Sequence, residues 1–294
     1  NNTILAIQNS REFESIVYVC GSHLSYEHGY TVNEVKESGV KNLNYVEMLL
    51  TGSSRVGLIK SVGLALISFA EKFNEDNLDC LLILGDRYEI LAAAQAAFFN
   101  DIPIAHIHGG EITEGAFDEA IRHSITKMAH IHFPVTKDFA KRIMQLGEPK
   151  ESIFNVGAPG IENIKKHQPL DFNELNIDIN ECFNDHLALV TYHPVTKGAD
   201  TENDIGQLIK AIKNFPDIGF IVTYPNADGS QNIISQWKEI DDLDNVCLLK
   251  SLGFKKYLSL MKVVKFVLGN SSSGIIEAPS FKIPTINIGT RQNG

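Results

Sequence analysis

Cysteine is scarce in this chain of 294 residues, which contains only Cys20, Cys80, Cys182 and Cys247, all far apart. They form neither a CxxC pair nor a Cys/His ligand spacing, so a disulfide framework and a zinc site are both disfavoured. We expect them to be small buried side chains in a reducing compartment. No apolar run is long enough to cross a bilayer and no signal peptide opens the chain, which predicts a cytoplasmic protein without a membrane partner.

Positive charge is also in short supply, because 26 Lys and Arg residues face 36 Asp and Glu residues, giving a net charge of −10. A nucleic-acid partner is therefore not expected, since binding to its phosphates needs a basic surface. A phosphorylated small molecule remains compatible with this charge if its site is locally positive. The chain also lacks the Walker A and GxGxxG patterns, which disfavours ATP hydrolysis and NAD binding.

The chain does contain a regular alternation of short apolar runs and longer amphipathic stretches, in an ordinary globular composition with 44% hydrophobic residues. This alternation is typical of an α/β fold, with parallel sheets covered by helices on both faces. The expected strands are residues 15–20, 80–84, 104–107, 132–135, 187–191, 219–223, 246–249, 263–268 and 285–288. The expected helices are residues 57–74, 88–100, 117–129, 137–146, 201–215 and 254–262.

The alternation breaks at residues 156–160, and a polar stretch from 165 to 185 follows before strands resume. We therefore place a boundary between two Rossmann-like, doubly wound domains, residues 1–163 and 164–294. Ligands of such sheets bind beyond the carboxyl ends of the strands, so the expected site is a cleft that the two domains face. The chain starts inside a helical pattern and stops just after a strand, and we expect truncation at both ends.

Polar residues follow the expected strand at 80–84, in the string Gly85-Asp86-Arg87-Tyr88-Glu89. Asp86 stands at the carboxyl end of the strand, where a carboxylate can act as an acid, as a base or as a ligand orienter. Arg87 beside it can pair with a phosphate. Alternatively, Asp86 only caps the following helix, and position alone does not separate the two interpretations.

The next strand ends in the string His106-Ile107-His108-Gly109-Gly110-Glu111. The two glycines allow the backbone to approach a ligand closely. His106 and His108 share one face of an extended segment, but the spacing offers no third metal ligand, so we expect no metal.

Four ionisable residues open the following helix within six positions: Asp118, Glu119, Arg122 and His123. Asp118 with Arg122, and Glu119 with His123, have the i, i+4 spacing of pairs on a solvated helix face. Their density directly after a glycine-rich loop favours a functional site instead.

The second half of the chain has three polar segments after strands. His193 precedes a proline, which holds its backbone extended, and it is a candidate contact to a phosphate or a sugar. Asn226 and Asp228 lie in a polar loop whose alternative interpretation is an ordinary turn. The most informative segment is residues 269–274, here named the serine loop, where a strand runs into small residues and then a helix. Free N–H groups and hydroxyls at such a turn bind phosphate, unless a serine only caps the helix. The residues expected to contact the ligand there are Ser271, Ser272, Ser273, Gly274, Glu277 and Arg291.

Together these segments resemble the hydrolysing UDP-N-acetylglucosamine 2-epimerases of sialic acid and other nonulosonic acid biosynthesis, through nearly the whole chain. The resemblance is carried by residues 85–89, 106–111, 118–123, 193–196, 269–277 and 289–292, in this order and spacing. It implies a GT-B-like fold of two Rossmann-like domains, a homodimer, and a UDP-sugar substrate. It also implies elimination of UDP to give 2-acetamidoglucal, then rehydration to N-acetylmannosamine, with no metal or nicotinamide cofactor.

The resemblance assigns roles to the candidate residues. The acid–base group on the sugar side would be Asp86, His108, Glu111, Asp118, Glu119, Arg122 and His193. The UDP-binding group would be Arg87, Asn226, Asp228, Ser271, Ser272, Ser273, Gly274, Glu277 and Arg291. The sequence departs from many relatives at His108, where they carry a glutamate, so either His108 or Glu111 takes that role here.

Three alternatives share most of these features. The first is a 2-epimerase that acts on UDP-2,4-diacetamido-2,4,6-trideoxyglucose, in the legionaminic acid route. The second is a GT-B glycosyltransferase with the same nucleotide site. The third is a non-catalytic UDP-sugar sensor, which the number of carboxylates disfavours because binding of an anion alone does not call for them.

Overall fold

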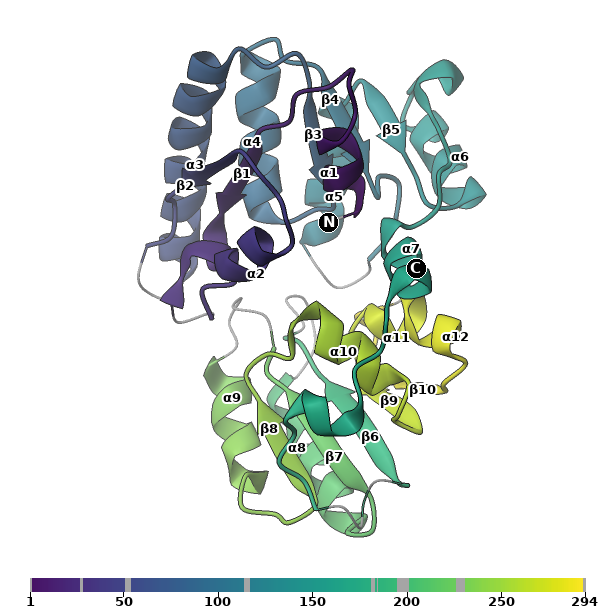
Figure 1. Ribbon diagram of the computed structural model, residues 1–294. Helices are drawn as coiled ribbons and strands as arrows, with labels where there is room; N and C mark the ends of the chain where they lie inside the picture. Colours follow the sequence, from purple (N-terminus) through teal and green to yellow (C-terminus); the bar gives the residue numbers. More distant parts are fainter. Residues whose placement is uncertain are drawn as a thin grey trace. The chain divides into compact units, whose positions relative to one another are not determined.

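The computed structural model describes residues 2–26, 29–50, 54–113, 117–180, 183, 185–194, 201–225 and 231–292. The chain divides into two compact units (Figure 1). Unit 1 consists of Asn1–Ile112 with Phe117–Pro159, and unit 2 contains Gly160–Gly294. The division falls at the start of helix α7 (Pro159–Lys166), and the boundary expected between residues 163 and 164 falls within that helix. The functions assigned to the two halves stay a prediction.

Unit 1 contains two parallel sheets, β1–β2 and β3–β4–β5, with helices between the strands. Its strands are β1 (Val17–Cys20), β2 (Leu43–Val46), β3 (Leu81–Leu84), β4 (Ile104–Ile107) and β5 (Ile131–Phe133). Its helices are α1 (Asn2–Gln8), α2 (Val32–Glu37), α3 (Arg55–Asp76), α4 (Tyr88–Phe99), α5 (Asp118–Met128) and α6 (Lys137–Gln145).

The core of unit 1 lies between these sheets and the neighbouring helices α3, α4 and α5 (Figure 1). Helix α4 is rich in alanine, and its small buried side chains allow α3 and α5 to pack closely on it. All four residues of β4 are buried, which identifies it as a central strand. Because β3, β4 and β5 are parallel, their carboxyl ends lie at one edge, where the polar strings of the sequence begin.

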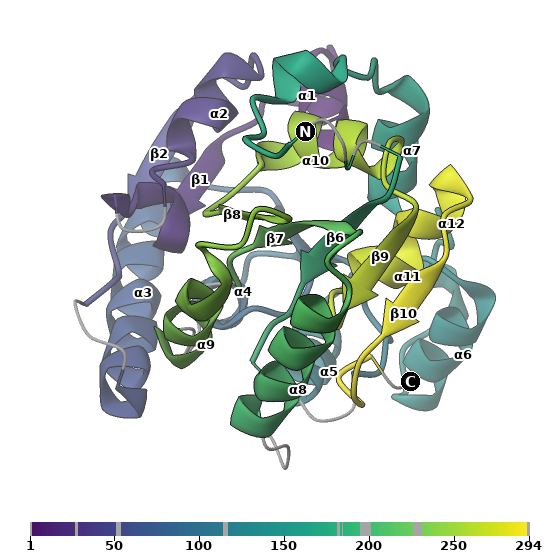
Figure 2. The same ribbon diagram turned by 90° about the horizontal axis from the view of Figure 1, so that it is seen from below.

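Unit 2 contains one parallel sheet with the strand order β10-β9-β6-β7-β8 (Figure 2). Its strands are β6 (Leu187–Thr191), β7 (Gly219–Thr223), β8 (Val246–Leu249), β9 (Phe266–Gly269) and β10 (Thr285–Asn287). Its helices after α7 are α8 (Thr201–Asn214), α9 (Gln231–Trp237), α10 (Gly253–Met261), α11 (Ser273–Ile276) and α12 (Ala278–Phe281).

Helices cover both faces of the unit 2 sheet, and the central strand β6 shows how. Ala188 and Val190 pack in one core cluster, with residues of α8 and α9. Leu187 and Leu189 point to the opposite face and pack in a second cluster, with residues of α10 and α12. Side chains alternate between faces along a strand, so burial on both sides requires a continuous apolar run. The predicted α/β class with doubly wound parallel sheets is confirmed.

Each expected strand is present, with end residues that differ by a few positions. The largest shift is in β9, which starts at Phe266 because the N–H groups of Val263 and Val264 still bond to the last turn of α10. Strand β2 was not predicted, because its sequence LNYV alternates and leaves Tyr45 exposed.

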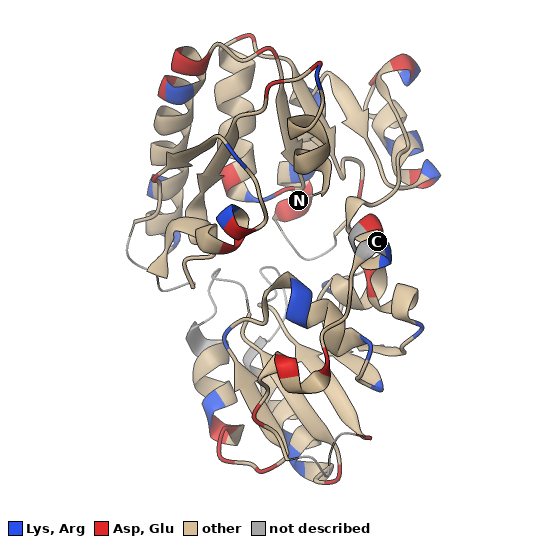
Figure 3. Cartoon of the chain, viewed as in Figure 1, with Lys and Arg blue, Asp and Glu red and all other residues tan. Residues whose placement is uncertain are grey.

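The expectation of four buried cysteines is wrong for Cys80, which is exposed, whereas Cys20 is half-buried and Cys247 is buried. Cys182 lies outside the described residues. Acidic and basic residues are interspersed along α3 and α6 (Figure 3). Among the helices that the structure describes, none combines the length and the apolar character that a membrane span needs.

Candidate functional site

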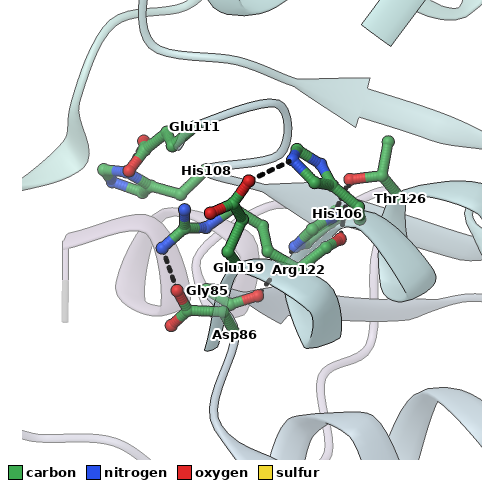
Figure 4. Close-up of polar contacts among 9 residues, drawn as sticks. Gly85, Asp86, His106, His108, Glu111, Glu119, Arg122 and Thr126 are labelled. Atoms are coloured by element: carbon green, nitrogen blue, oxygen red, sulfur yellow. Dashed lines mark hydrogen bonds and ion pairs between the residues drawn. The ribbon is translucent and has the colours of Figure 1, made fainter. Parts of the chain in front are cut away.

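His106 joins three elements of unit 1 at the carboxyl edge of its sheet (Figure 4). Its ring is fully buried, with Nε2 2.8 Å from the carbonyl oxygen of Gly85 and Nδ1 3.3 Å from the hydroxyl oxygen of Thr126. A carbonyl only accepts, so Nε2 carries the proton and donates it. Burial lowers the pKa of His106 to about 4, opposed by the bond to Gly85. A neutral His106 therefore ties β4 to the end of β3 and to α5.

Asp86 follows directly and forms an ion pair with Arg122 of α5 (Figure 4). Arg122 is buried, and the side chain of Asp86 is 20% exposed. The N-cap position of α4 belongs to Arg87, and no side-chain cap hydrogen bond is present there. Asp86 therefore does not cap α4, since its carboxylate pairs with a guanidinium from another element, and its role in a site stays a prediction.

His108 and Glu111 form one hydrogen-bonded pair, with Nδ1 2.5 Å from Oε1. Both side chains are less than one-fifth exposed. His108 has a φ of +65°, a left-handed conformation that a non-glycine residue adopts only when its surroundings enforce it. If Nδ1 donates to the carboxylate of Glu111, then Nε2 is left with a lone pair for proton transfer.

The two glycines between them pack against protein on the side where a Cβ would stand, and the close approach of their backbone to a ligand stays a prediction. A Cβ on Gly110 would lie 2.5 Å from the carbonyl oxygen of Phe139, on α6. A Cβ on Gly109 would lie 3.1 Å from both Nδ1 of His106 and the hydroxyl of Thr126. The glycines thus hold the loop against α6 and against the His106–Thr126 contact.

Helix α5 opens with Asp118 and Glu119 in its first turn. Glu119 Oε1 lies 3.9 Å from Nε2 of His123, as the i, i+4 spacing predicts. Burial lowers the pKa of His123, and the charge of Glu119 opposes that shift. Asp118 is half-buried, and the guanidinium of Arg122, its expected partner, contacts Asp86.

Arg87 is oriented by a carboxylate that the sequence had not singled out. Its Nε and one terminal nitrogen lie 3.2 and 3.3 Å from the two carboxylate oxygens of Glu89. The Glu89 side chain is only 7% exposed, and a Cβ on Gly21 would lie 2.9 Å from Oε1 of Glu89. This two-point contact with a buried carboxylate fixes the guanidinium, and a contact of Arg87 with a phosphate stays a prediction.

In unit 2, the strand order reverses at β6, which pairs with β7 on one side and with β9 on the other. Such a switch point is where open α/β sheets bind ligands. His193 follows β6 and Asn270 follows β9, and the Asn270 amide bonds to both backbone polar groups of His193. Gly269 permits this approach, because with a φ of +138° its Cβ would lie 1.9 Å from the carbonyl oxygen of Thr191.

The serine loop is held by its own hydroxyls and by α10. The Ser273 N–H and hydroxyl both donate to Ser271 Oγ, at 3.3 and 3.2 Å. Tyr257 Oη lies 2.5 Å from Ser273 Oγ, and burial raises the pKa of this tyrosine. Arg291 donates to the carbonyl of Asn270 at 3.1 Å. The sequence did not single out Tyr257, which lies in an expected helix, because no local pattern indicates its contact with Ser273, 16 residues later.

The helix after this loop differs from the expectation. Helix α11 has only four residues, and Glu277 stands at the junction before α12, whose first turn contains a proline. Ser272 occupies the N-cap position of α11 without a side-chain cap bond, but the hydroxyl of Ser271 accepts the N–H of Ser273, the first residue of this helix. Gly274 is required by packing, because its Cβ would lie 2.6 Å from Cγ2 of Thr285.

Each unit thus brings together a different chemistry. Unit 1 assembles carboxylates and imidazoles that can exchange protons beside guanidinium groups, and unit 2 assembles hydroxyls and a guanidinium that can bind an anion. Within the described residues, no group of three His, Cys, Asp or Glu side chains is placed to hold a metal ion. Asn226 and Asp228 lie outside the described residues.

Comparison with known proteins gives a consistent result. The profile of the family described as "UDP-N-acetylglucosamine 2-epimerase" matches residues 5–294. The chain is 39% identical over 297 residues to "GDP/UDP-N,N'-diacetylbacillosamine 2-epimerase (hydrolyzing)" of Campylobacter jejuni, which covers 98% of this chain and 76% of that protein. It is 36% identical over 292 residues to "Polysialic acid biosynthesis protein P7" of Escherichia coli, which covers 98% of this chain and 74% of that protein.

Solved structures confirm the fold. A crystal structure of UDP-GlcNAc 2-epimerase from Neisseria meningitidis bound to UDP-GlcNAc superposes with a TM-score of 0.79. The match covers 97% of this chain and 78% of that chain, at 21% sequence identity. The expected GT-B-like arrangement of two Rossmann-like domains is therefore the fold of this chain.

Proposed function

The chain belongs to the UDP-N-acetylglucosamine 2-epimerase family, and from that premise we propose that it is a hydrolysing 2-epimerase that converts a UDP-2-acetamido sugar into UDP and a free sugar inverted at C2. It is an enzyme of the UDP-sugar 2-epimerase type, as its relatives are named. The observation that carries the proposal is the acid–base group of unit 1, where Asp86, His108 and Glu119 are each held by a neighbouring side chain.

The reaction needs a base at C2 and stabilisation of the leaving UDP. A base removes the C2 proton while the bond from C1 to the diphosphate oxygen breaks, which gives UDP and a 2-acetamidoglucal. Water then adds its oxygen to C1, and a proton reaches C2 from the opposite face. The C2 proton is weakly acidic, so its removal calls for positioned acid–base groups shielded from bulk water.

We assign the proton transfer to unit 1. His108 Nε2 acts as a base or an acid, and Glu111 orients the ring through Nδ1, as an acidic partner orients a catalytic histidine in hydrolases. Asp86, held by Arg122, and Asp118 with Glu119 are the further acid–base candidates on the sugar. In this proposal His108 and Glu111 act together in proton transfer, with His108 exchanging the proton and Glu111 orienting its ring.

We assign UDP binding to unit 2. The serine loop offers backbone N–H groups and hydroxyls for the diphosphate, and Arg291 supplies positive charge beside it. Glu277 is proposed to contact the ribose, and His193 the phosphate or the reacting sugar. In unit 1, Arg87 is proposed as a further contact to the diphosphate. The residues Asn226 and Asp228 stay predictions, as do the homodimer and the cytoplasmic location.

The substituent at C4 of the sugar defines two candidate substrates. UDP-N-acetylglucosamine, leading to sialic acid-type sugars, is supported by the resemblance of the motifs and by the relative named for polysialic acid biosynthesis. UDP-N,N'-diacetylbacillosamine, the diacetamido alternative, is supported by the name of the relative with 39% identity. A glycosyltransferase with the same fold is not favoured by the family.

The test is incubation with each UDP-sugar separately in heavy water, with UDP release and proton NMR as the readouts. We expect UDP and the free sugar in equal amounts, with deuterium at C2 of N-acetylmannosamine or of its diacetamido counterpart. The faster of the two reactions identifies the substrate. Release of a sugar with an unchanged C2 and without deuterium would refute the elimination route, and a requirement for an acceptor would identify a transferase.

A further inference from the structure

Asn270 is a fully buried amide at the point where β6 and β9 separate. Its Oδ1 accepts the N–H of His193 at 2.7 Å, and its Nδ2 donates to the carbonyl of His193 at 2.9 Å. The two contacts need an acceptor on one side of the amide and a donor on the other, which only one orientation of an asparagine provides. The whole side chain is therefore used to hold the backbone of one residue.

The backbone of Asn270 is fixed as well. Its N–H donates to the carbonyl of Thr191 at 3.1 Å, and its own carbonyl accepts from Arg291 at 3.1 Å and from Gln292 at 2.8 Å. One buried residue therefore contacts the segment after β6 and the segment after β10. These are the segments that carry His193 and Arg291.

We propose that Asn270 is a positioning residue for turnover, which sets the direction of the His193 side chain through its backbone. The proposal rests on the proposed function, because the role of His193 does. Pro194 restricts His193 to an extended backbone, and Asn270 holds the peptide groups on both sides of its Cα, which together set the direction of the Cα–Cβ bond that carries the imidazole. Asn270 is buried beneath the residues that would meet the ligand, so it acts through His193 and Arg291 instead of on the substrate.

The test compares Asn270→Ala with Asn245→Ala. Asn245 is a matched control, because it is also buried and its Nδ2 donates to two backbone carbonyls, those of Phe215 at 3.2 Å and Ile218 at 2.9 Å. It lies at the start of β8, at the opposite end of the sheet from the serine loop. The measurements are kcat per folded molecule from UDP release, the Kd of UDP by calorimetry, and the melting temperature.

We expect both variants to lower the melting temperature. Asn270→Ala should lower kcat by on the order of 10- to 100-fold, as expected for a displaced catalytic group. The Kd of UDP should change by less than about threefold, because the backbone carbonyl that Arg291 contacts is retained. Asn245→Ala should leave kcat unchanged. A kcat of Asn270→Ala within about twofold of the unmodified protein would overturn the proposal. Absence of UDP release by the unmodified protein would instead refute the proposed function.

Two further variants separate positioning from a purely structural role. In the His193→Ala background, Asn270→Ala should lower kcat by less than about threefold, because both changes disable the same group, whereas multiplying effects would contradict the proposal. Asn270→Asp retains the acceptor for the His193 N–H, and its protonated form also restores the donor. Its kcat relative to the unmodified protein should therefore rise as the pH falls, and a constant ratio would count against the proposal.

Discussion

Replacing His106 by glutamine tests whether this buried histidine is neutral in the folded protein. Burial lowers its pKa from 6.5 to about 4. Between these two values the unfolded chain binds more protons than the folded chain, so protonation favours unfolding. The stabilisation due to neutral His106 is complete above pH 6.5 and is lost as the pH falls towards 4. Glutamine can still donate to the carbonyl of Gly85, but it does not titrate.

The magnitude follows from the two pKa values. Each pH unit between them contributes about 1.4 kcal/mol, and integration from pH 7.5 to 4.5 gives roughly 2 to 3 kcal/mol. Loss of the Thr126 contact in the variant costs about 1 kcal/mol at every pH. The difference in unfolding free energy, unmodified protein minus variant, is therefore expected to fall by roughly 2 to 3 kcal/mol over this range and to change sign. Titrating groups that do not interact with His106 are present in both proteins and cancel.

The assay is urea denaturation of both proteins at pH 7.5, 6.5, 5.5 and 4.5, with the midpoint and the slope fitted at each pH. If the difference between the unmodified protein and His106→Gln stays within about 0.5 kcal/mol across the range, His106 is not a neutral buried group and the reasoning fails.

Three further changes test the geometry of the candidate site. Gly269→Ala should destabilise the protein by more than about 3 kcal/mol in thermal melting, because its Cβ would meet a carbonyl oxygen 1.9 Å away at a positive φ, whereas Gly206→Ala on α8, where a Cβ meets nothing within 4 Å, should not. Tyr257→Phe should weaken UDP binding by about three- to tenfold in calorimetry, since the serine loop loses a hydrogen bond; unchanged binding would contradict this. Glu111→Gln should lower kcat by on the order of 100-fold with little effect on KM, because His108 loses the carboxylate that orients it. An increase in KM with an unchanged kcat would indicate a role in binding instead.

The elements of the fold could be predicted because burial on two faces leaves a clear pattern in the sequence. Strand β6 is buried at all five positions, so it appears as a continuous apolar run that no surface strand needs. Strand β2 lacks this pattern, since Tyr45 points outward and is 44% exposed, and it could not be found by the same rule. The short length of α11 was also missed, although Pro279 stands in the first turn of α12.

The position of the candidate site could be predicted from one rule, that ligands meet the carboxyl ends of parallel strands. The rule locates Asp86, His108 and His193 without any knowledge of their partners. Contacts within one helix turn also followed, as for Glu119 and His123. The catalytic and binding roles of these residues stay predictions, because the contacts that the structure describes are those among protein groups.

The partners across the fold could not be predicted, because nothing in a local pattern specifies them. The spacing of Arg122 indicates Asp118 as a neighbour, but it gives no sign of the contact between its guanidinium and Asp86, 36 residues earlier. Local spacing gives only one neighbour of a long side chain, whereas the packing of α5 against the end of β3 brings another. The His193–Asn270 contact spans 77 residues. In the sequence, nothing distinguishes Asn270 from any other asparagine in a polar turn. The pairing of β6 with β9 brings the Asn270 amide beside His193, where its oxygen and its nitrogen both form hydrogen bonds. Its role can therefore be recognised only after the two strands are placed side by side.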